Sequence, residues 1–389
     1  MSTILIPSNI LRDTKRMFAR LRHQRMTLPV LHHILLQADH RGVRLTATNL
    51  DHWIETRVSE DPHEPAEFLI PADAMEAACR ADRGSEVTLT SFGGKRSKDL
   101  SLVIIQGGIE ATSVHPTLDP KEFPERPDLK GEETTLPPDT LRNLAVVAGC
   151  ASDDRTRHIL NGVFFTTGDG GQLVATNGRL LAVSPAAVPP QEFILPNLAA
   201  HILDQPAFTT DLVTFTWLEA KDPEMRRVAF RCGRHLLVAT TLTGTYPNYR
   251  QVVPTHAKEL AVIPHDRRPG LIAWLRSLKS GNRRDPSVRL DWNKRGQLTL
   301  THRDEEGRSA ILHVPVEVHG KPPVIGFNPD YLAQALEIGS TLCLHDELSP
   351  GICRHPNGRF CVLMPMRVTI PTTADKPEAA SSIGIAHAA

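Results

Sequence analysis

Short stretches of alternating or clustered β-branched residues recur along most of the chain and predict strands. Turn pairs such as Gly107-Gly108 and Asn357-Gly358 separate these stretches, as antiparallel hairpins require. The clearest predicted strands are Val43–Thr48, Glu86–Thr90, Ser101–Ile105, Val163–Thr167, Val228–Arg231, Leu236–Thr241 and Ser309–Val314. The pattern therefore predicts a protein dominated by antiparallel sheet.

Two helix-like segments, each opened by a proline, interrupt the strands three times. Intervals of 130 and 127 residues separate the prolines that open the first helices, Pro7, Pro137 and Pro264. Intervals of 125 and 133 residues separate those that open the second helices, Pro71, Pro196 and Pro329. A threonine-rich strand lies between the two helices of each copy and contains Thr48, Thr176 or Thr301. Because solenoid repeats are much shorter, this period indicates one whole domain used three times.

The sequence thus predicts an α+β fold of three tandem similar domains, each with two helices backed by antiparallel sheets. Polar residues and prolines near 130–133 and 253–256 place the boundaries, so the expected domains are residues 1–130, 131–256 and 257–368. A length of 389 residues suits two to three domains. After Val368 the composition changes to mainly Ala, Ser, Thr and Pro, so residues 369–389 are expected to be a disordered tail.

Charge and cysteine content limit the class of protein. Lys+Arg and Asp+Glu both number 44, so the net charge is zero and any basic surface must be local. The six cysteines show no Cys-x-x-Cys spacing, and no early apolar stretch resembles a signal peptide. We therefore expect a protein of the reducing cytoplasm. No run of about 18 apolar residues is present, so no membrane span is expected.

The first helix of the first and third copies is strongly basic. Between Asn9 and Arg25, apolar residues fall near one face and basic residues line another, with Asp13 the only acid. In the first helix of the middle copy, Asp139 to Gly149, Arg142 is the only basic residue. For any one of these helices, the alternative interpretation is that the basic face only contacts solvent. Two basic helices at equivalent places in a neutral chain favour phosphate binding without base specificity. The residues expected to bind such a polyanion are Arg12, Lys15, Arg16, Arg20, Arg25, Arg267, Arg268, Arg276, Lys279 and Arg283.

No motif in the chain indicates catalysis or a metal. Gly93–Ser97 resembles a phosphate loop but lacks its first glycine, so a basic hairpin tip is the better interpretation. Asp153 and Asp154 are adjacent carboxylates, which usually face solvent or cap helices. The chain has no His-Glu-x-x-His motif, no Cys/His cluster with zinc spacing and no Gly-x-Ser-x-Gly elbow. We therefore expect no enzyme activity, no metal and no cofactor.

Several local strings, in order along residues 1–368, resemble the bacterial β sliding clamp, the processivity subunit of DNA polymerase III. They are Thr27–Leu31, Leu45–Leu50, Leu160–Val163, Val174–Gly178, Tyr246–Arg250, Ile325–Asn328 and Val362–Val368. The resemblance implies a homodimer, in which two monomers close head to tail into a ring of six domains. Helices would line the hole and hold double-stranded DNA without sequence preference. The role that the resemblance implies is processivity in DNA replication, without catalysis.

The resemblance also implies a groove between the middle and last domains. There a short peptide from the DNA polymerase III α subunit, the clamp loader or another clamp-binding protein would insert apolar anchors. For the C-terminal string Val362–Arg367, the alternative is a core strand in which methionine fills space in the packing. The matching positions are Leu160, Thr176, Gly178, Arg179, Leu180, Leu181, Pro247, Arg250, Val252, Val362, Leu363, Met364, Pro365, Met366 and Arg367.

Some features depart from the family pattern. The family usually has Asp-Gly-His-Arg-Leu where this chain has Asn177–Leu181, so a groove arginine is moved by one position or lost. Typical clamps are acidic and end near the position of Val368. The expected ring interface, near Glu110, Thr112 and Lys279-Ser280, is polar here. A clamp-like accessory protein that competes for partner peptides without a stable ring therefore stays an alternative. A nucleotide-processing enzyme is another, supported only by the acidic and histidine content.

Overall fold

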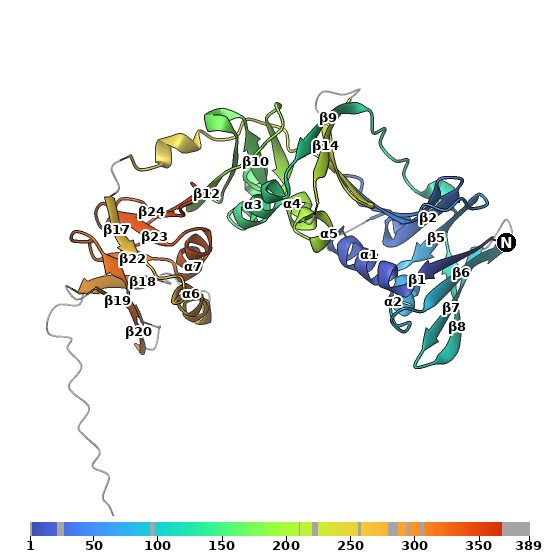
Figure 1. Ribbon diagram of the computed structural model, residues 1–389, viewed down its shortest axis with the longest axis horizontal. Helices are drawn as coiled ribbons and strands as arrows, with labels where there is room; N and C mark the ends of the chain where they lie inside the picture. The colour runs from blue at the N-terminus through green and yellow to red at the C-terminus, as the bar shows by residue number, and fades with distance from the viewer. Residues whose placement is uncertain are drawn as a thin grey trace, which may run out of the picture. The chain divides into compact units, whose positions relative to one another are not determined.

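The computed structural model describes residues 2–21, 27–93, 98–209, 211–219, 225–255, 258–278, 287–293, 296–303 and 307–367 (Figure 1). The chain forms two compact units. The first unit contains Met1–Gln251 and His355–Cys361, and the second contains Val252–Arg354 and the residues from Val362 onward. Each unit combines antiparallel sheets with a few short helices, so the predicted α+β class is confirmed.

The first unit has two sheets of its own. The four-stranded sheet has the order β1 (Ser2–Pro7), β6 (Glu86–Gly93), β7 (Lys98–Gln106) and β8 (Ile109–Thr117). The eight-stranded sheet has the order β5 (Ala66–Pro71), β2 (His33–Asp39), β3 (Gly42–Thr48), β4 (His52–Ser59), β16 (His235–Thr240), β15 (Arg227–Cys232), β14 (Val213–Leu218) and β9 (Gly131–Leu136). Pairing of β4 with β16 joins the two predicted domains 1–130 and 131–256 within one sheet. The division into three domains stays a prediction.

Four further antiparallel strands complete the first unit. Their order is β13 (Phe193–Pro196), β10 (Gly162–Thr166), β11 (Gln172–Thr176) and β12 (Leu180–Pro185). The helices of this unit are α1 (Ser8–Leu21), α2 (Ala72–Ala78), α3 (Pro138–Ala148), α4 (Asn197–Leu203) and α5 (Pro206–Thr209). Single turns of 3-10 helix are η1 (Pro29–His32), η2 (Pro120–Glu122), η3 (Arg155–Leu160), η4 (Gly168–Gly170) and, at the unit's end, η5 (Tyr249–Val252).

The second unit repeats the pattern of two helices with antiparallel strands. One sheet has the order β20 (Ser309–Pro315), β19 (Gln297–Arg303), β18 (Val288–Asn293) and β22 (Ile325–Phe327). The other strands have the order β24 (Gly351–Arg354), β23 (Thr341–Leu344), β17 (Lys258–Val262) and β21 (Glu317–Val318). The helices are α6 (Arg268–Ser277) and α7 (Pro329–Ile338), which pack together. The division between the units falls within β25 (Phe360–Leu363).

Five of the six prolines lie where the repeat places helix starts, whereas Pro264 lies four residues before α6. Pro71, Pro137 and Pro196 are the N-cap residues of α2, α3 and α4, Pro329 is the first residue of α7, and Pro7 directly precedes α1. Proline suits these positions because its fixed φ is compatible with the first turn and its missing N–H costs no helical hydrogen bond. In α1, Leu11, Met17, Phe18 and Leu21 are buried. This apolar face packs on α2 and on the eight-stranded sheet.

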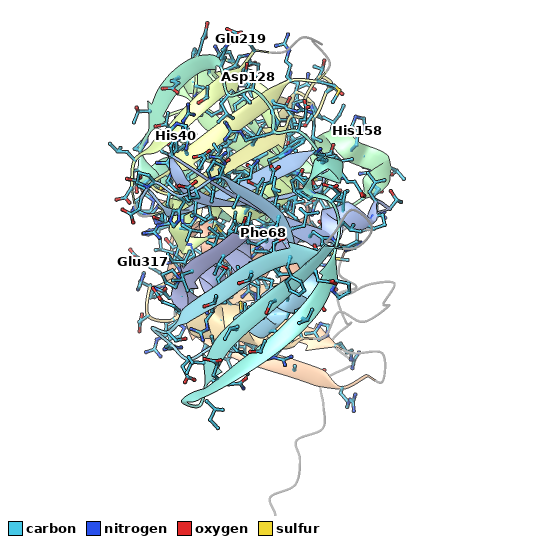
Figure 2. All side chains as sticks on the ribbon, turned by 90° about the vertical axis from the view of Figure 1, so that its right-hand side faces the viewer. His40, Phe68, Asp128, His158, Glu219 and Glu317 are labelled. Carbon is cyan, nitrogen blue, oxygen red and sulfur yellow. The ribbon has the colours of Figure 1, made fainter. Side chains whose placement is uncertain are left out.

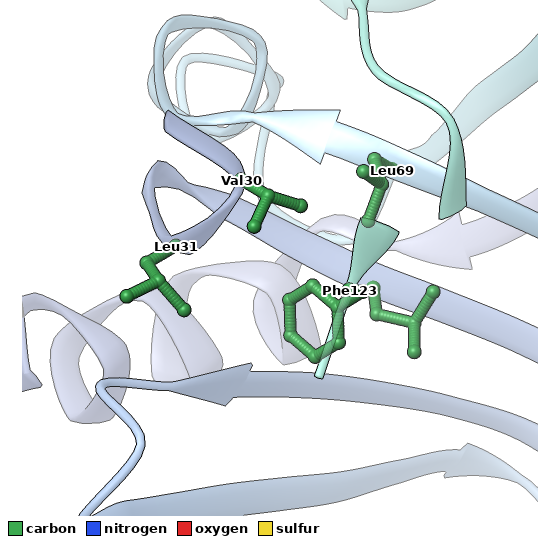
Figure 3. Close-up of a cluster of buried hydrophobic side chains, with 5 residues drawn as sticks. Val30, Leu31, Leu69 and Phe123 are labelled. Atoms are coloured by element: carbon green, nitrogen blue, oxygen red, sulfur yellow. The ribbon is translucent and has the colours of Figure 1, made fainter. Parts of the chain in front are cut away.

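The opposite face of the eight-stranded sheet has its own apolar cluster (Figure 3). Phe123 follows η2 and packs against Val30, Leu31, Leu35 and Leu69. Farther along the same segment, Leu129 packs against a second cluster around Trp53, Leu236 and Val238. The segment between Phe123 and Leu129 is thus held against the sheet at both ends.

One local expectation was wrong. The polar run 130–133, which the sequence predicts to interrupt the strands, contains the start of β9, whose Glu132 and Glu133 pair with Trp217 and Thr216 of β14. β9 is an edge strand, and an edge tolerates exposed charged side chains that a central strand does not.

Candidate nucleic-acid and partner sites

The basic side chains of α1 differ in what they contact. The Nε of Arg12 donates a 3.1 Å hydrogen bond to the carbonyl of Cys79, and its Nη2 donates to the carbonyl of Ala81. These carbonyls lie just past the end of α2, where backbone acceptors have no helical partner. Arg12 therefore joins the end of α2 to α1, and its guanidinium is largely engaged.

Arg16 and Arg20 lie farther along the same helix. The Arg16 side chain is 77% exposed and makes only a loose 3.7 Å ion pair with Asp13. With the Gln205 amide oxygen turned toward α1, Arg20 Nε donates to it at 2.8 Å. Burial, with a smaller contribution from the charge of Arg20, lowers the pKa of His201 on α4. Arg20 thus raises the local positive potential between α1 and α4, while Arg16 faces solvent.

Lys15 of α1 lines a small, mostly apolar cavity with Phe18, Ala47 and Met75. Its side chain is half-buried there. Arg25, the last predicted member of this helix, lies outside the described residues.

In the second unit, the predicted basic residues lie at both ends of α6. Arg267 is exposed and pairs with Asp266 at 3.1 Å, whereas Arg268 is half-buried at the first position of the helix. Arg276 in the last turn pairs with Glu337 of α7. The helix ends at Ser277. Lys279 and Arg283, which were expected on the same helix, lie outside the described residues.

The partner-site residues of the first unit include a tight turn between β11 and β12. The Asn177 side-chain oxygen accepts from the backbone N–H groups of Arg179, at 2.9 Å, and Leu180, at 2.8 Å. Gly178 has φ +86°, a left-handed conformation that favours glycine. Thr176 Oγ1 donates to the Leu180 carbonyl at 2.7 Å. The Arg179 side chain is therefore presented on a rigid turn and is exposed.

Arg250 is held in place before the end of the first unit. Its Nη2 and Nε donate to Asp169 Oδ2 at 2.9 and 3.2 Å, and its guanidinium carbon lies 5.3 Å from the ring centre of Tyr249. The hydrogen bonds that Arg250 donates to Asp169 raise the pKa of Arg250. Nearby, Tyr246 stacks on Phe164 with ring centres 4.9 Å apart. Pro247 is exposed between these two anchored tyrosines, and Leu160 is half-buried at the end of η3.

The partner-site residues of the second unit border a hollow of about 410 Å³. It is lined by Val324, Ile325, Gly326, Glu347, Leu348, Met366 and Arg367. A backbone bridge between Met366 and Gly326 fixes the strand after β25 along its wall. The sequence analysis identified Met366 and Arg367 but missed Leu348, whose side chain is 62% exposed in a turn held by Asp346. The only signal in the sequence that could have identified Leu348 is a leucine placed in a turn.

Several other predicted partner residues differ in exposure. Met364 is 46% exposed and Val252 is exposed, while Pro365 is half-buried. Leu180, Leu181, Val362 and Leu363 are buried. The exposed members are Arg179, Pro247 and Arg250 in the first unit and Val252, Met364 and Arg367 in the second, and Met366 lines the hollow described above.

Comparisons with known proteins agree with this geometry. A family profile described as DNA polymerase III beta subunit, N-terminal domain, matches residues 8–127. The beta sliding clamp of Caulobacter vibrioides strain NA1000 is 26% identical over 369 residues, covering 89% of this chain and 94% of that protein. That of Escherichia coli K12 is 27% identical and covers 80% of this chain and 83% of its own length. Over most of its length, the chain is similar in sequence to members of the β sliding clamp family.

The fold agrees with the family as well. The crystal structure of the DNA polymerase sliding clamp from Bacillus subtilis aligns with a TM-score of 0.77 at 20% identity, covering 94% of this chain and 99% of that chain. Among the described residues, no group of three His, Cys, Asp or Glu side chains is placed to hold a metal ion. Within the same ranges, no helix is both long and apolar enough to span a bilayer.

Proposed function

We propose that this protein is a DNA sliding clamp, which encircles duplex DNA and tethers the replicative polymerase and other partners to it during replication. The protein acts by encircling DNA and binding its partners, and it does not catalyse a reaction. Its place of action is the cytoplasm, where the DNA is. The observation that carries the proposal is a pair of open sheet edges, one in each unit, in a chain that is similar to sliding clamps over most of its length.

The open edges are β8 in the first unit and β20 in the second. Within the described residues, β8 pairs only with β7, and β20 pairs only with β19. β8 exposes Ile109 (73%) and Val114, and β20 exposes Ile311 (55%). A long edge with apolar side chains invites pairing with another chain. Pairing of β8 of one copy with β20 of a second copy supports a closed homodimer, because two such heterologous contacts complete a ring.

Contact with DNA is assigned to the helices. Arg16, Arg20, Lys15, Arg267, Arg268 and Arg276 supply positive charge from α1 and α6, in a chain of zero net charge. Their ion pairs with Asp13, Asp266 and Glu337 are solvent-exposed, and such pairs contribute little and exchange readily for phosphate. Attraction of this kind has no base specificity and permits sliding.

Partner binding is assigned to the exposed side chains around Met364 and the hollow of Met366 and Leu348. A flexible thioether beside exposed aliphatic side chains suits extended peptides of varied sequence. Arg367 at the rim of the hollow adds a polar contact. In the first unit, Arg250 on its fixed platform is a separate candidate contact. The DNA polymerase III α subunit, the clamp loader and other clamp-binding proteins are the expected sources of such peptides.

The deciding experiment loads the purified protein on a nicked circular DNA with a clamp loader and then linearises the circle. A sliding clamp stays on the circle and leaves the linear form. Equal retention on both forms would contradict encirclement. A protein that binds partner peptides but remains monomeric and is never retained on the circle would instead be the accessory competitor.

A further inference from the structure

The eight-stranded sheet of the first unit carries a group of arginines on the face turned away from the helices. β3 and β4 contribute Arg44 and Arg57, which are direct cross-strand partners, and β15 contributes Arg231. Neighbouring residues of a strand alternate between faces. Thr56, next to Arg57, points to the helix side, where it bonds to His235 at 3.2 Å, and His235 contacts Phe208 of α5. The arginines therefore lie on the opposite face.

Two further arginines come from outside the sheet. Arg41 belongs to the turn between β2 and β3, and Arg126 belongs to the segment that Phe123 and Leu129 hold across the sheet. Figure 2 labels His40 of this turn and Asp128 of this segment. The five arginines, with Glu55, Gly42, Val43 and Leu129, line a hollow of about 220 Å³.

The charge balance inside the hollow is positive. Glu55 is its one acidic lining residue; its side chain is only 10% exposed and accepts from Arg126 at 2.8 Å. Arg44 and Arg57 pair with Asp39 and Glu60 at the margin, at 3.1 and 2.9 Å. Arg231 makes no hydrogen bond or ion pair with any residue that the structure describes. With all eight charged side chains counted, five arginines face three carboxylates.

Repulsion among the arginines makes this arrangement less stable locally, and a bound anion would relieve it. Like charges directly opposite on neighbouring strands destabilise a sheet, and the Arg44–Arg57 pair places two guanidinium groups in that position. Nothing apolar in the lining other than Val43 and Leu129 could anchor a peptide side chain. Guanidinium groups donate in a planar fork that matches phosphate oxygens, and the hollow contains arginine but no lysine.

We propose that the arginine hollow, formed by Arg41, Arg44, Arg57, Arg126 and Arg231, binds phosphate groups. The site is separate from α1 and α6 and does not depend on ring closure. Its ligand is an oligophosphate, either free, as in a nucleoside triphosphate, or as successive phosphodiesters of a single-stranded nucleic acid. Arg44, Arg57 and Arg231 contact it from the sheet floor, and Arg126 contacts it from the covering segment.

The test titrates sodium tripolyphosphate into the full-length protein by calorimetry at low salt. The variant Arg44→Gln/Arg231→Gln should bind at least about tenfold more weakly, since each charge-assisted hydrogen bond is worth about tenfold or more. Glu55→Gln should bind about threefold more tightly, because it removes a like charge a few Å from the ligand. Arg83→Gln, an exposed arginine in the turn before β6, is the matched control and should bind as the unmodified protein does. Unchanged thermal unfolding confirms that each variant is folded.

Competition identifies the source of the phosphate. In an Arg16→Glu/Arg276→Glu background, a single-stranded oligonucleotide that is displaced by tripolyphosphate and lost in the Arg44→Gln/Arg231→Gln variant indicates phosphodiesters. Tripolyphosphate binding without oligonucleotide binding indicates a free oligophosphate. Equal competition by a polyglutamate peptide would overturn the assignment to phosphate. Absence of tripolyphosphate binding, or binding that the double variant leaves unchanged, would overturn the site itself.

Discussion

Arginines of the first unit differ in their contacts, and these contacts separate structural from binding roles. Arg12 is bound to carbonyls beyond α2, Arg250 is fixed by Asp169 and Tyr249, and Arg16 is open to solvent. A guanidinium with satisfied donors has little to offer a phosphate, whereas an exposed one exchanges water for phosphate at low cost. The residue type alone does not distinguish these roles, so the sequence predicted Arg12 and Arg16 as equals.

Met364 should be a principal apolar contact for partner peptides. Replacement by alanine removes exposed thioether area that an extended peptide with leucine and phenylalanine anchors would cover. We expect binding to weaken by about 1–3 kcal/mol. Fluorescence anisotropy of a labelled peptide measures this. Met225→Ala, at a similarly exposed methionine of the first unit, is the control. Equal losses in the two variants would remove Met364 from the site.

The buried His52 and the half-buried His235 should make stability depend on pH. Burial lowers the pKa of His52 to about 4, and burial with the charge of Arg234 lowers that of His235 to about 4. Both are neutral in the folded protein, while the unfolded chain takes up protons below its usual pKa of about 6.5. Stability is therefore complete above pH 6.5 and falls between pH 6.5 and 4. The loss approaches about 3 kcal/mol for His52 and is smaller for the partly exposed His235.

Urea unfolding at a series of pH values measures this dependence. His52→Gln cannot titrate in this range, so the slope of stability against pH should become shallower by close to one proton. His32→Gln, at an exposed histidine, should leave the slope unchanged. An identical slope in the His52 variant would show that carboxylates alone cause the acid sensitivity.

At the scale of the element, the arginines of α1 have two different roles. Arg12 is bonded to carbonyls beyond the end of α2 and, with the buried residues Leu11 and Phe18, holds α1 in place. Arg16, one turn later on the same polar face, is exposed to solvent. Arg12→Gln should therefore lower the free energy of unfolding by about 1–3 kcal/mol, because buried carbonyls lose their donor. Arg16→Glu should leave stability within about 0.5 kcal/mol and reduce retention on circular DNA.

Two assays separate the structural role of Arg12 from the DNA-binding role of Arg16. Urea unfolding gives the stability of each variant, and retention on a nicked circle at increasing salt gives the DNA contribution. The unmodified protein should lose retention steeply as salt rises, and Arg16→Glu should shift that loss to lower salt. An Arg16→Glu variant that is destabilised but shows normal DNA retention would contradict the DNA-binding role of Arg16.

Elements were more predictable than sites. The predicted strands Val43–Thr48 and Ser309–Val314 correspond to β3 and β20, because β-branched alternation reports directly on a half-buried pleated surface. β9 was missed because its pairing with β14, distant in sequence, overrides its polar composition. The arginine hollow was missed for the same reason. Its members lie between positions 41 and 231, and only strand register brings them together.

On the scale of the whole molecule, the open edges decide the assembly. The sequence analysis noted polar Glu110 and Thr112 at the expected interface, and the structure adds the apolar side chains of Ile109, Val114 and Ile311 on the same edges. A mixed edge of this kind combines strand pairing with moderate apolar burial. We therefore expect a homodimer that is stable at micromolar concentration and sensitive to one well-placed charge.

Ile311→Asp tests this directly. A carboxylate in the middle of β20 would be desolvated against the partner's β8 without a positive partner, so dimerisation should weaken by about 2–4 kcal/mol. Light scattering should then give the monomer mass where the unmodified protein gives twice that mass, and retention on nicked circular DNA should be lost. Leu212→Asp, at an equally exposed leucine outside β20, controls for added charge and should stay dimeric and retained. A dimeric, retained Ile311→Asp protein would exclude β20 from the interface, whereas a monomeric unmodified protein would point to the accessory role.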